Sequence, residues 1–174
     1  LVYPRALGTS ITTSFGTQMQ TFITKVLGAY GSTTTGIDIE FVDQIDKRKK
    51  YCQLKSGPNA INKDDIKTIK DHFQAVKNLA RTNNLKIDLS DLVFCLTYGE
   101  ESEKNSFVKA LEKEYTVYMG KDFWHRFTGD QHFYRDLIHS AGEIAKEVNM
   151  KDIVDEVIKD LSKDIGTRFK KISS

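Results

Sequence analysis

Two short segments with a period of two, joined by a polar connection, constrain the fold more than any other feature of the chain. In residues 36–42 two acids alternate with apolar residues, and in residues 51–55 an amide and an amine do the same. Such a pair of segments predicts a β-hairpin. The hairpin brings four polar side chains to one side of two neighbouring strands: Asp38, Glu40, Gln53 and Lys55.

Helical periodicity of apolar residues surrounds this hairpin. Asn62 and Asp65 have the spacing of a capping box, which marks the start of a helix. Strands that alternate with helices predict the α/β class, with a central mixed β-sheet, helices on both faces and a helical C-terminal part. The expected helices span residues 15–29, 62–81, 103–114, 131–148 and 151–165, with a helical turn at 122–127. The further strands span 91–98 and 116–119.

The totals suit one domain, since 174 residues can bury a full hydrophobic core. We expect a catalytic core over about residues 14–120 and a helical part over about 121–174. No apolar run is long enough to span a membrane and no signal-peptide pattern opens the chain, so a cytoplasmic protein is expected. Cys52 and Cys95 are predicted to be buried thiols. Because the chain starts at Leu1 without a methionine, we expect processing or a longer parent chain.

Acids and amines on the inner side of a strand are costly to desolvate unless they are paired or bind a metal. The carboxylate of Asp38 and the amide oxygen of Gln53 are hard oxygen ligands that suit Mg²⁺. Lys55 would then lie beside a metal-bound water and stabilise negative charge on hydroxide or phosphate. The hairpin therefore predicts a site for metal-assisted phosphoryl chemistry.

The residues Gly36-Ile37-Asp38 and Gln53-Leu54-Lys55 resemble the motif of the PD-(D/E)xK nuclease superfamily. The order of elements is also similar: a helix, the acidic strand, the xK strand, a helix and a strand, over residues 14–98. Together with the stretches QLKSGPN and DFWHRFTG, this looks most like type II restriction endonucleases. In this chain Gln53 stands where the second acid of the motif is usual, and Gln20 stands where similar nucleases carry a helix glutamate.

The resemblance implies a restriction-endonuclease-like fold and a Mg²⁺-dependent endonuclease that hydrolyses double-stranded DNA at specific sites. The implied catalytic residues are Asp38, Gln53 and Lys55, with Asp38 and Gln53 as metal ligands and Glu40 as a source of the missing charge. A homodimer is expected, because symmetric cutting of both strands needs two copies of one site.

Three alternatives stay open at the level of sequence. Gln20 and Gln53 also suit a catalytically inactive DNA-binding or partner subunit on the same fold. Glu40 and Lys55 would, in another interpretation, simply form a salt bridge. A repair or modification-dependent nuclease would carry the same motif. The recognition sequence cannot be read from the chain, and either the C-terminal helices or a segment before Leu1 is expected to supply it.

Several residues near the motif are candidates for contact with DNA. The basic run that includes Lys47 and Lys49 would neutralise phosphates or form a solvated turn. Asn62 and Lys63 lie at a helix N-terminus, which suits phosphate oxygens, although a helix cap explains Asn62 better. The full set of candidates is Gln20, Lys47, Lys49, Asn59, Asn62 and Lys63.

The remaining polar and aromatic residues give weaker signals. The histidines at 72, 125, 132 and 139 have no zinc-binding pattern and are expected to be structural. The aromatic group at 123–134 suits either the core or base stacking. Residues 98–100 follow a central strand, where α/β proteins often build sites, but no motif marks them.

Overall fold

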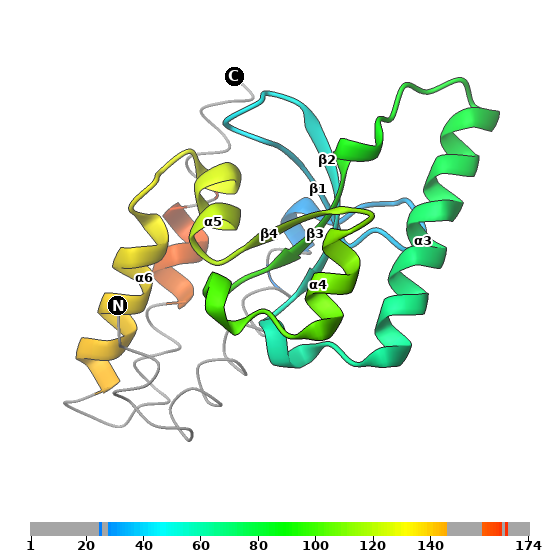
Figure 1. Cartoon of the computed structure of the whole chain (residues 1–174). Coiled ribbons are helices and arrows are strands. Elements are labelled where there is room, and N and C mark those ends of the chain that lie inside the picture. Colours follow the sequence, from blue (N-terminus) through cyan, green and yellow to red (C-terminus); the bar gives the residue numbers. More distant parts are fainter. Residues whose placement is uncertain (1–24, 26–27, 146–157, 165, 167–174) are drawn as a thin grey trace.

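A computed structural model describes residues 25, 28–145, 158–164 and 166 of the chain. It shows a four-stranded mixed sheet in the order β1-β2-β3-β4, in which β1 and β2 are antiparallel and β2, β3 and β4 are parallel (Figure 1). The strands are β1 (Ile39–Val42), β2 (Lys49–Lys55), β3 (Leu92–Leu96) and β4 (Thr116–Met119). The α/β class and the predicted hairpin are therefore confirmed.

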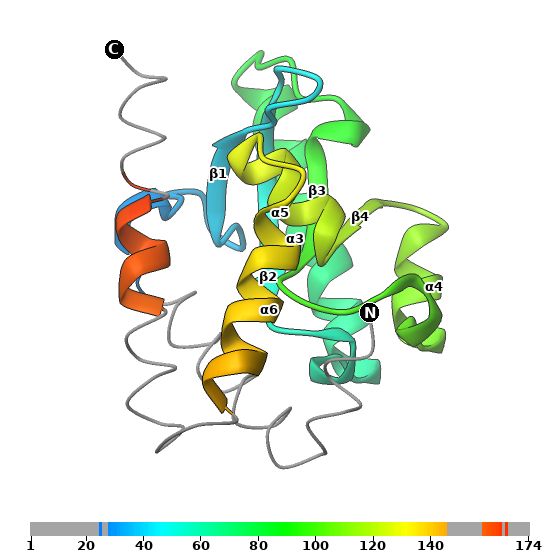
Figure 2. The ribbon, with the colours of Figure 1, turned by 90° about the vertical axis from the view of Figure 1, so that its left-hand side faces the viewer.

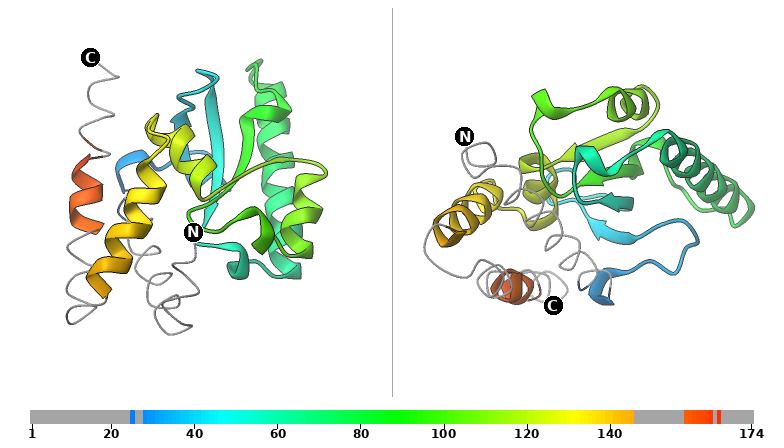
Figure 3. Two further views of the ribbon diagram at one scale, coloured as in Figure 1. Left: turned by 60° about the vertical axis from the view of Figure 1, so that its left-hand side comes forward. Right: turned by 90° about the horizontal axis from the view of Figure 1, so that it is seen from below.

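Helices cover both faces of this sheet. Seen from the side of α5 and α6, these two helices lie in front of the strands and α3 lies behind them (Figure 2). Two further views show the same three layers (Figure 3). The helices are α3 (Lys63–Thr82), α4 (Ser106–Glu112), α5 (Lys121–Thr128) and α6 (Phe133–Ala145), and residues 158–164 are also helical.

Each layer has its own hydrophobic core. Between the sheet and α3 with α4, the core includes Phe73, Phe94 and Leu111. Between the sheet and α5 with α6, it includes Trp124 and the aromatic residues at 123, 127 and 133. These aromatic side chains are buried, so they belong to the core and are not available to stack on bases. The Trp124 indole N–H donates to the Thr97 carbonyl (2.7 Å), which satisfies its one polar atom.

Local signals placed most elements correctly. The capping box of Asn62 and Asp65 is present and starts α3, and every residue of β3 is buried, as its apolar sequence predicts. The helical turn expected at 122–127 is the helix α5. Two expectations need correction. α4 is shorter than the predicted helix at 103–114. The alternation placed Ile37 on the same side as Ile39, but Ile37 packs on the α3 side of the sheet and Ile39 on the other side.

Both cysteines are buried and neither forms a disulfide, as predicted. No helix in the described part of the chain combines the length and the apolar character that crossing a membrane requires. Of the predicted helix at 15–29, only residues 25, 28 and 29 lie within the described residues, and they are helical.

Candidate active site

Asp38 lies one residue before β1, at the edge of the sheet where β2 ends. Its backbone N–H donates to the Cys52 carbonyl (2.9 Å), and its Oδ2 accepts a hydrogen bond from the backbone N–H of Leu54 (2.7 Å). The ladder of β1 and β2 begins at the pair Ile39 and Cys52. The carboxylate of Asp38 therefore accepts the Leu54 N–H in place of a backbone carbonyl of the neighbouring strand. This hydrogen bond fixes the carboxylate to β2.

The carboxyl group of Asp38 is half-buried and its surroundings compensate its charge only in part. Burial raises its pKa above the ordinary value. The N–H of Leu54 and the electrostatic interactions with Lys55 and His72 lower the pKa, but they do not cancel the effect of burial. A cation bound to this carboxylate would therefore stabilise its charged form.

Gln53 is buried, and both ends of its side-chain amide have partners on α3. Its Nε2 donates to the backbone carbonyl of Ile69 (2.9 Å), and its Oε1 lies 3.2 Å from Nδ1 of His72. Because the amide nitrogen must face the Ile69 carbonyl, Oε1 can only accept, so Nδ1 of His72 carries the proton. The Oε1 atom of Gln53 has a second lone pair, which can coordinate a cation or accept a further hydrogen bond.

Lys55 is the last residue of β2, and its ammonium group is less tightly held. Its Nζ lies 3.6 Å from Oδ1 of Asp65, and its side chain is 39% exposed. The other oxygen of Asp65 accepts the backbone N–H of Asn62 in the capping box (2.8 Å). The capping box at the start of α3 thus positions the carboxylate of Asp65, and this carboxylate in turn restrains the ammonium group of Lys55.

Glu40 lies on β1, and other groups surround its carboxylate. Lys49 Nζ is 2.5 Å from its Oε2, and Ser32 Oγ donates to its Oε1 (2.6 Å). Burial raises the pKa of Glu40, but the hydrogen bonds from Lys49 and Ser32 outweigh this effect and leave the pKa lowered. The charge of Glu40 is therefore already neutralised by a lysine on the neighbouring strand.

His72, which its sequence context predicts to be structural, also belongs to this cluster. It contacts Gln53, acts electrostatically on Asp38 and packs against Gly36. Gly36 has a φ of +82°, and a Cβ there would lie 2.6 Å from Cγ of His72. The glycine before Asp38 is therefore required both by backbone conformation and by the close approach of the histidine. No local sequence signal links residues 36 and 72.

The DNA-contact candidates lie in different environments. Lys47 is exposed at the hairpin turn, whereas Lys49 is paired with Glu40. Asn59 and Lys63 are exposed close to the end of β2. Asn62 accepts the N–H groups of residues 64 and 65, so it acts as the predicted cap. Gln20 lies outside the described residues.

The described residues contain no group of three or more His, Cys, Asp or Glu side chains that could hold a metal ion. The donors present at this edge are nevertheless suited to Mg²⁺, which keeps several waters and needs few protein ligands. Asp38 offers an undercompensated carboxylate and Gln53 one amide lone pair. These two side chains are the ones that would hold the ion.

One family model matches residues 7–149 of the chain, and that family is described as type II restriction endonuclease EcoO109I. No curated protein and no solved structure gave a significant match. The matched range covers the hairpin, α3 and the rest of the sheet. The resemblance to the PD-(D/E)xK superfamily, inferred from the motif around Asp38 and Lys55, is confirmed by this match.

Proposed function

Because the chain belongs to the type II restriction endonuclease EcoO109I family, we propose that it is a Mg²⁺-dependent endonuclease that hydrolyses double-stranded DNA at specific sites. One observation supports this above all others. Asp38 and Lys55 are held at the same end of one hairpin, where burial raises the pKa of Asp38 and the charge of Lys55 counteracts it. An acid and an amine in this arrangement suit phosphodiester hydrolysis.

Each side chain has a role that follows from its surroundings. Asp38 and the oxygen of Gln53 would hold Mg²⁺, which when bound polarises the phosphate and lowers the pKa of a coordinated water. The ammonium of Lys55 would stabilise the attacking hydroxide and the developing charge on the phosphate. His72 orients the amide of Gln53, and Asp65 restrains Lys55.

We propose a homodimer as the active form, since each copy carries one such hairpin and a double-strand cut needs two.

The 3.6 Å contact between Lys55 and Asp65 leaves the ammonium free to move toward a phosphate, because a long contact to a half-exposed side chain holds it weakly.

A second candidate function is a catalytically inactive DNA-binding or partner subunit. It is favoured by the neutralisation of Glu40 by Lys49 and by the two α3 contacts of Gln53, which leave Asp38 with little help in binding a cation. A repair or modification-dependent nuclease would share the same site and differ only in substrate.

The test compares the wild-type protein with Lys55→Ala on mapped plasmid DNA, with Mg²⁺ and with a chelator. We expect cleavage by the wild type only, and only with Mg²⁺, and a loss of about 10³-fold or more in the variant. Lys67→Ala is the matched control, because Lys67 is an exposed lysine on α3 that pairs with Asp71. Sequencing the cut ends would define the site and the stagger.

The outcomes separate the candidates. Retained DNA binding without cleavage by either protein would identify an inactive subunit. Equal cleavage by the wild type and by Lys55→Ala would remove Lys55 from the mechanism. A preference for methylated or branched DNA over plain duplex would identify a modification-dependent or repair nuclease.

A further inference from the structure

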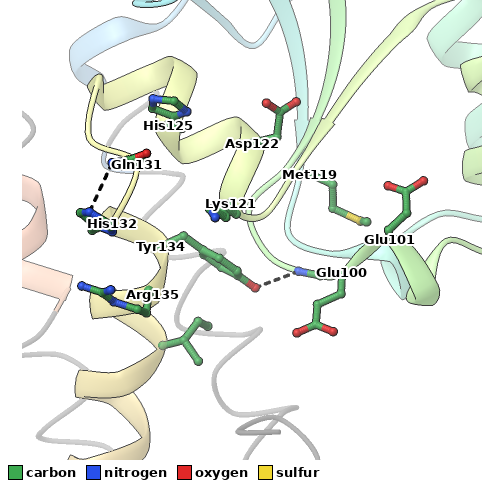
Figure 4. A pocket seen from close by; sticks show the side chains of 12 residues that line it. Glu100, Glu101, Met119, Lys121, Asp122, His125, Gln131, His132, Tyr134 and Arg135 are labelled. Carbon is green, nitrogen blue, oxygen red and sulfur yellow. Dashed lines mark hydrogen bonds between the residues drawn. The ribbon is translucent and has the colours of Figure 1, made fainter. Parts of the chain in front are cut away.

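A pocket of about 640 Å³ lies between residues 99–101 and the helices α5 and α6 (Figure 4). Tyr134 of α6 reaches across it, and its hydroxyl oxygen accepts the backbone N–H of Gly99 (3.1 Å). Met119, the last residue of β4, lies on the wall opposite α6. The pocket therefore opens where β3 and β4 end, and none of the residues assigned to hydrolysis lines it.

The pocket and the candidate active site share one edge of the sheet. β2, β3 and β4 are parallel, so their carboxyl ends lie together at this edge. Pairing continues beyond the strands: the Thr97 N–H donates to the Lys55 carbonyl (3.1 Å), and the Tyr98 N–H donates to the Ser56 carbonyl (3.0 Å). β2 and β4 are separated by one strand, which corresponds to about 10 Å. The major groove of DNA is about 12 Å wide. The end of β4 therefore lies within one groove width of the end of β2, where Lys55 is.

The charges around the pocket are divided between its two sides. Figure 4 shows Glu100 and Glu101 on the side of the strands, and His132 and Arg135 on the side of α6. Lys121 lies between them, at the start of α5. A ligand with a negative backbone would be repelled by the first side and attracted by the second.

Two of the acids in the pocket are already paired with cations that do not line it. Lys104 lies 2.6 Å from Glu101, and Arg126 lies 3.1 Å from Asp122. Arg135 contacts its neighbour Asp136, but both side chains are more than half exposed, so this pair is weak in water. Lys121 and Arg135 are both exposed, so these are the two cations of the pocket that can reach a ligand.

We propose that this pocket is a second binding site for the DNA substrate, at which Lys121 and Arg135 contact backbone phosphates away from the scissile phosphate. The inference rests on the proposed function, because it requires DNA at the edge of the sheet near Lys55. The site positions the duplex and does not read bases. The acidic side keeps the backbone against α6.

The test measures the affinity for a duplex that contains the cleaved site, with Ca²⁺ in place of Mg²⁺, over a range of salt concentrations. The double variant Lys121→Ala/Arg135→Ala should bind about tenfold more weakly. Its plot of log affinity against log salt should be shallower by about 2, because two phosphates are no longer neutralised by the protein. The cleaved sequence should stay the same.

The matched control is Arg81→Ala/Lys86→Ala, which removes the same charge from exposed positions near the C-terminal end of α3. This control should leave the salt dependence unchanged. An equal slope for the pocket variant and the control would overturn the inference, and so would a change of cleaved sequence in the pocket variant, because that would indicate base reading.

A measurement on the wild-type protein decides the question even if the variant does not fold. Ethylation of single phosphates should block binding at two groups of positions, one around the cut and one separate from it. A single group around the cut would overturn the inference. The proposed function fails separately, if the wild type neither binds nor cuts DNA.

Discussion

The two ends of β2 carry lysines with opposite surroundings. At the start of the strand, Lys50 is only 1% exposed, lies 2.6 Å from Asp46 and donates to the Ser90 carbonyl (3.2 Å). At the end of the strand, Lys55 is 39% exposed and has one carboxylate at 3.6 Å. A cation with full compensation stabilises the fold, whereas one with a single long contact remains available to a substrate. Burial and pairing thus separate a structural lysine from a functional one within one strand.

Two neighbours of Lys50 in the basic run are also in ion pairs, although their side chains are about half exposed. Arg48 binds both oxygens of Asp91 (2.8 Å and 2.6 Å) and one of Asp88 (2.6 Å), which joins the hairpin to the loop before β3. Lys49 is paired with Glu40. Three of the four residues in the basic run 47–50 therefore form ion pairs within the protein. The exposed cations Lys121 and Arg135, near the other end of the strands, are better placed to contact DNA.

The largest effect on stability is expected at the buried lysine. Lys50→Ala should lower the free energy of unfolding by about 3 kcal/mol. It removes the buried ion pair between Lys50 Nζ and Asp91 Oδ1 (3.6 Å) and leaves Asp91 less compensated. Lys55→Ala should lower it by less than about 1 kcal/mol. Denaturant unfolding of both variants measures the difference. Equal losses at the two positions would contradict the distinction between the ends of β2.

A smaller loss is expected where the active-site end depends on a glycine. Gly36→Ala should cost about 2 kcal/mol, because alanine is strained at a φ of +82° and its Cβ would overlap His72. Cleavage should fall as well, since His72 and Asp38 would shift. Gly28→Ala is the control, because nothing lies within 4 Å of a Cβ at that helical position, and it should leave stability unchanged or raise it. A stable and active Gly36→Ala variant would show that the approach of His72 is not required.

The smallest effect concerns the pH dependence of the structural end. The hydrogen bonds from Arg48 lower the pKa of Asp91 below its ordinary value. A lowered pKa in the folded state stabilises the protein above the unfolded pKa of about 3.9, and this contribution is lost as the pH falls through the folded value. Asp91→Asn should therefore cost about 1 kcal/mol at neutral pH and progressively less below about pH 4. A difference from the wild type that does not change with pH would show that the substitution acts through packing and not through charge.

The elements that the sequence predicted well are those with local signals. The capping box that starts α3 involves residues three positions apart, and the continuously apolar β3 needs no knowledge of its partners. The α5 region was expected to hold only a helical turn, because a helix of eight residues gives a short periodic signal. Its aromatic residues pack in the core against the sheet.

For the candidate site, the sequence predicted which residues lie together but not which ion pairs they form. The alternation of the hairpin placed Asp38, Gln53 and Lys55 at one edge, since strand periodicity is a property of neighbouring residues. Glu40 was expected to add negative charge for a metal ion, but its carboxylate pairs with Lys49 on the neighbouring strand. The alternation of residues does not predict this cross-strand contact.

The sequence by itself therefore determined the hairpin, the start of α3 and the three polar residues at the end of the motif, because hydrogen-bonding and packing preferences over a few residues specify them. Only the tertiary structure decided which charges are compensated. His72 meets Gln53, Asp65 meets Lys55, and Arg48 meets Asp91 through contacts between distant segments. The electrostatic energy of each group depends on those distances and on burial, and no local pattern of residues encodes either.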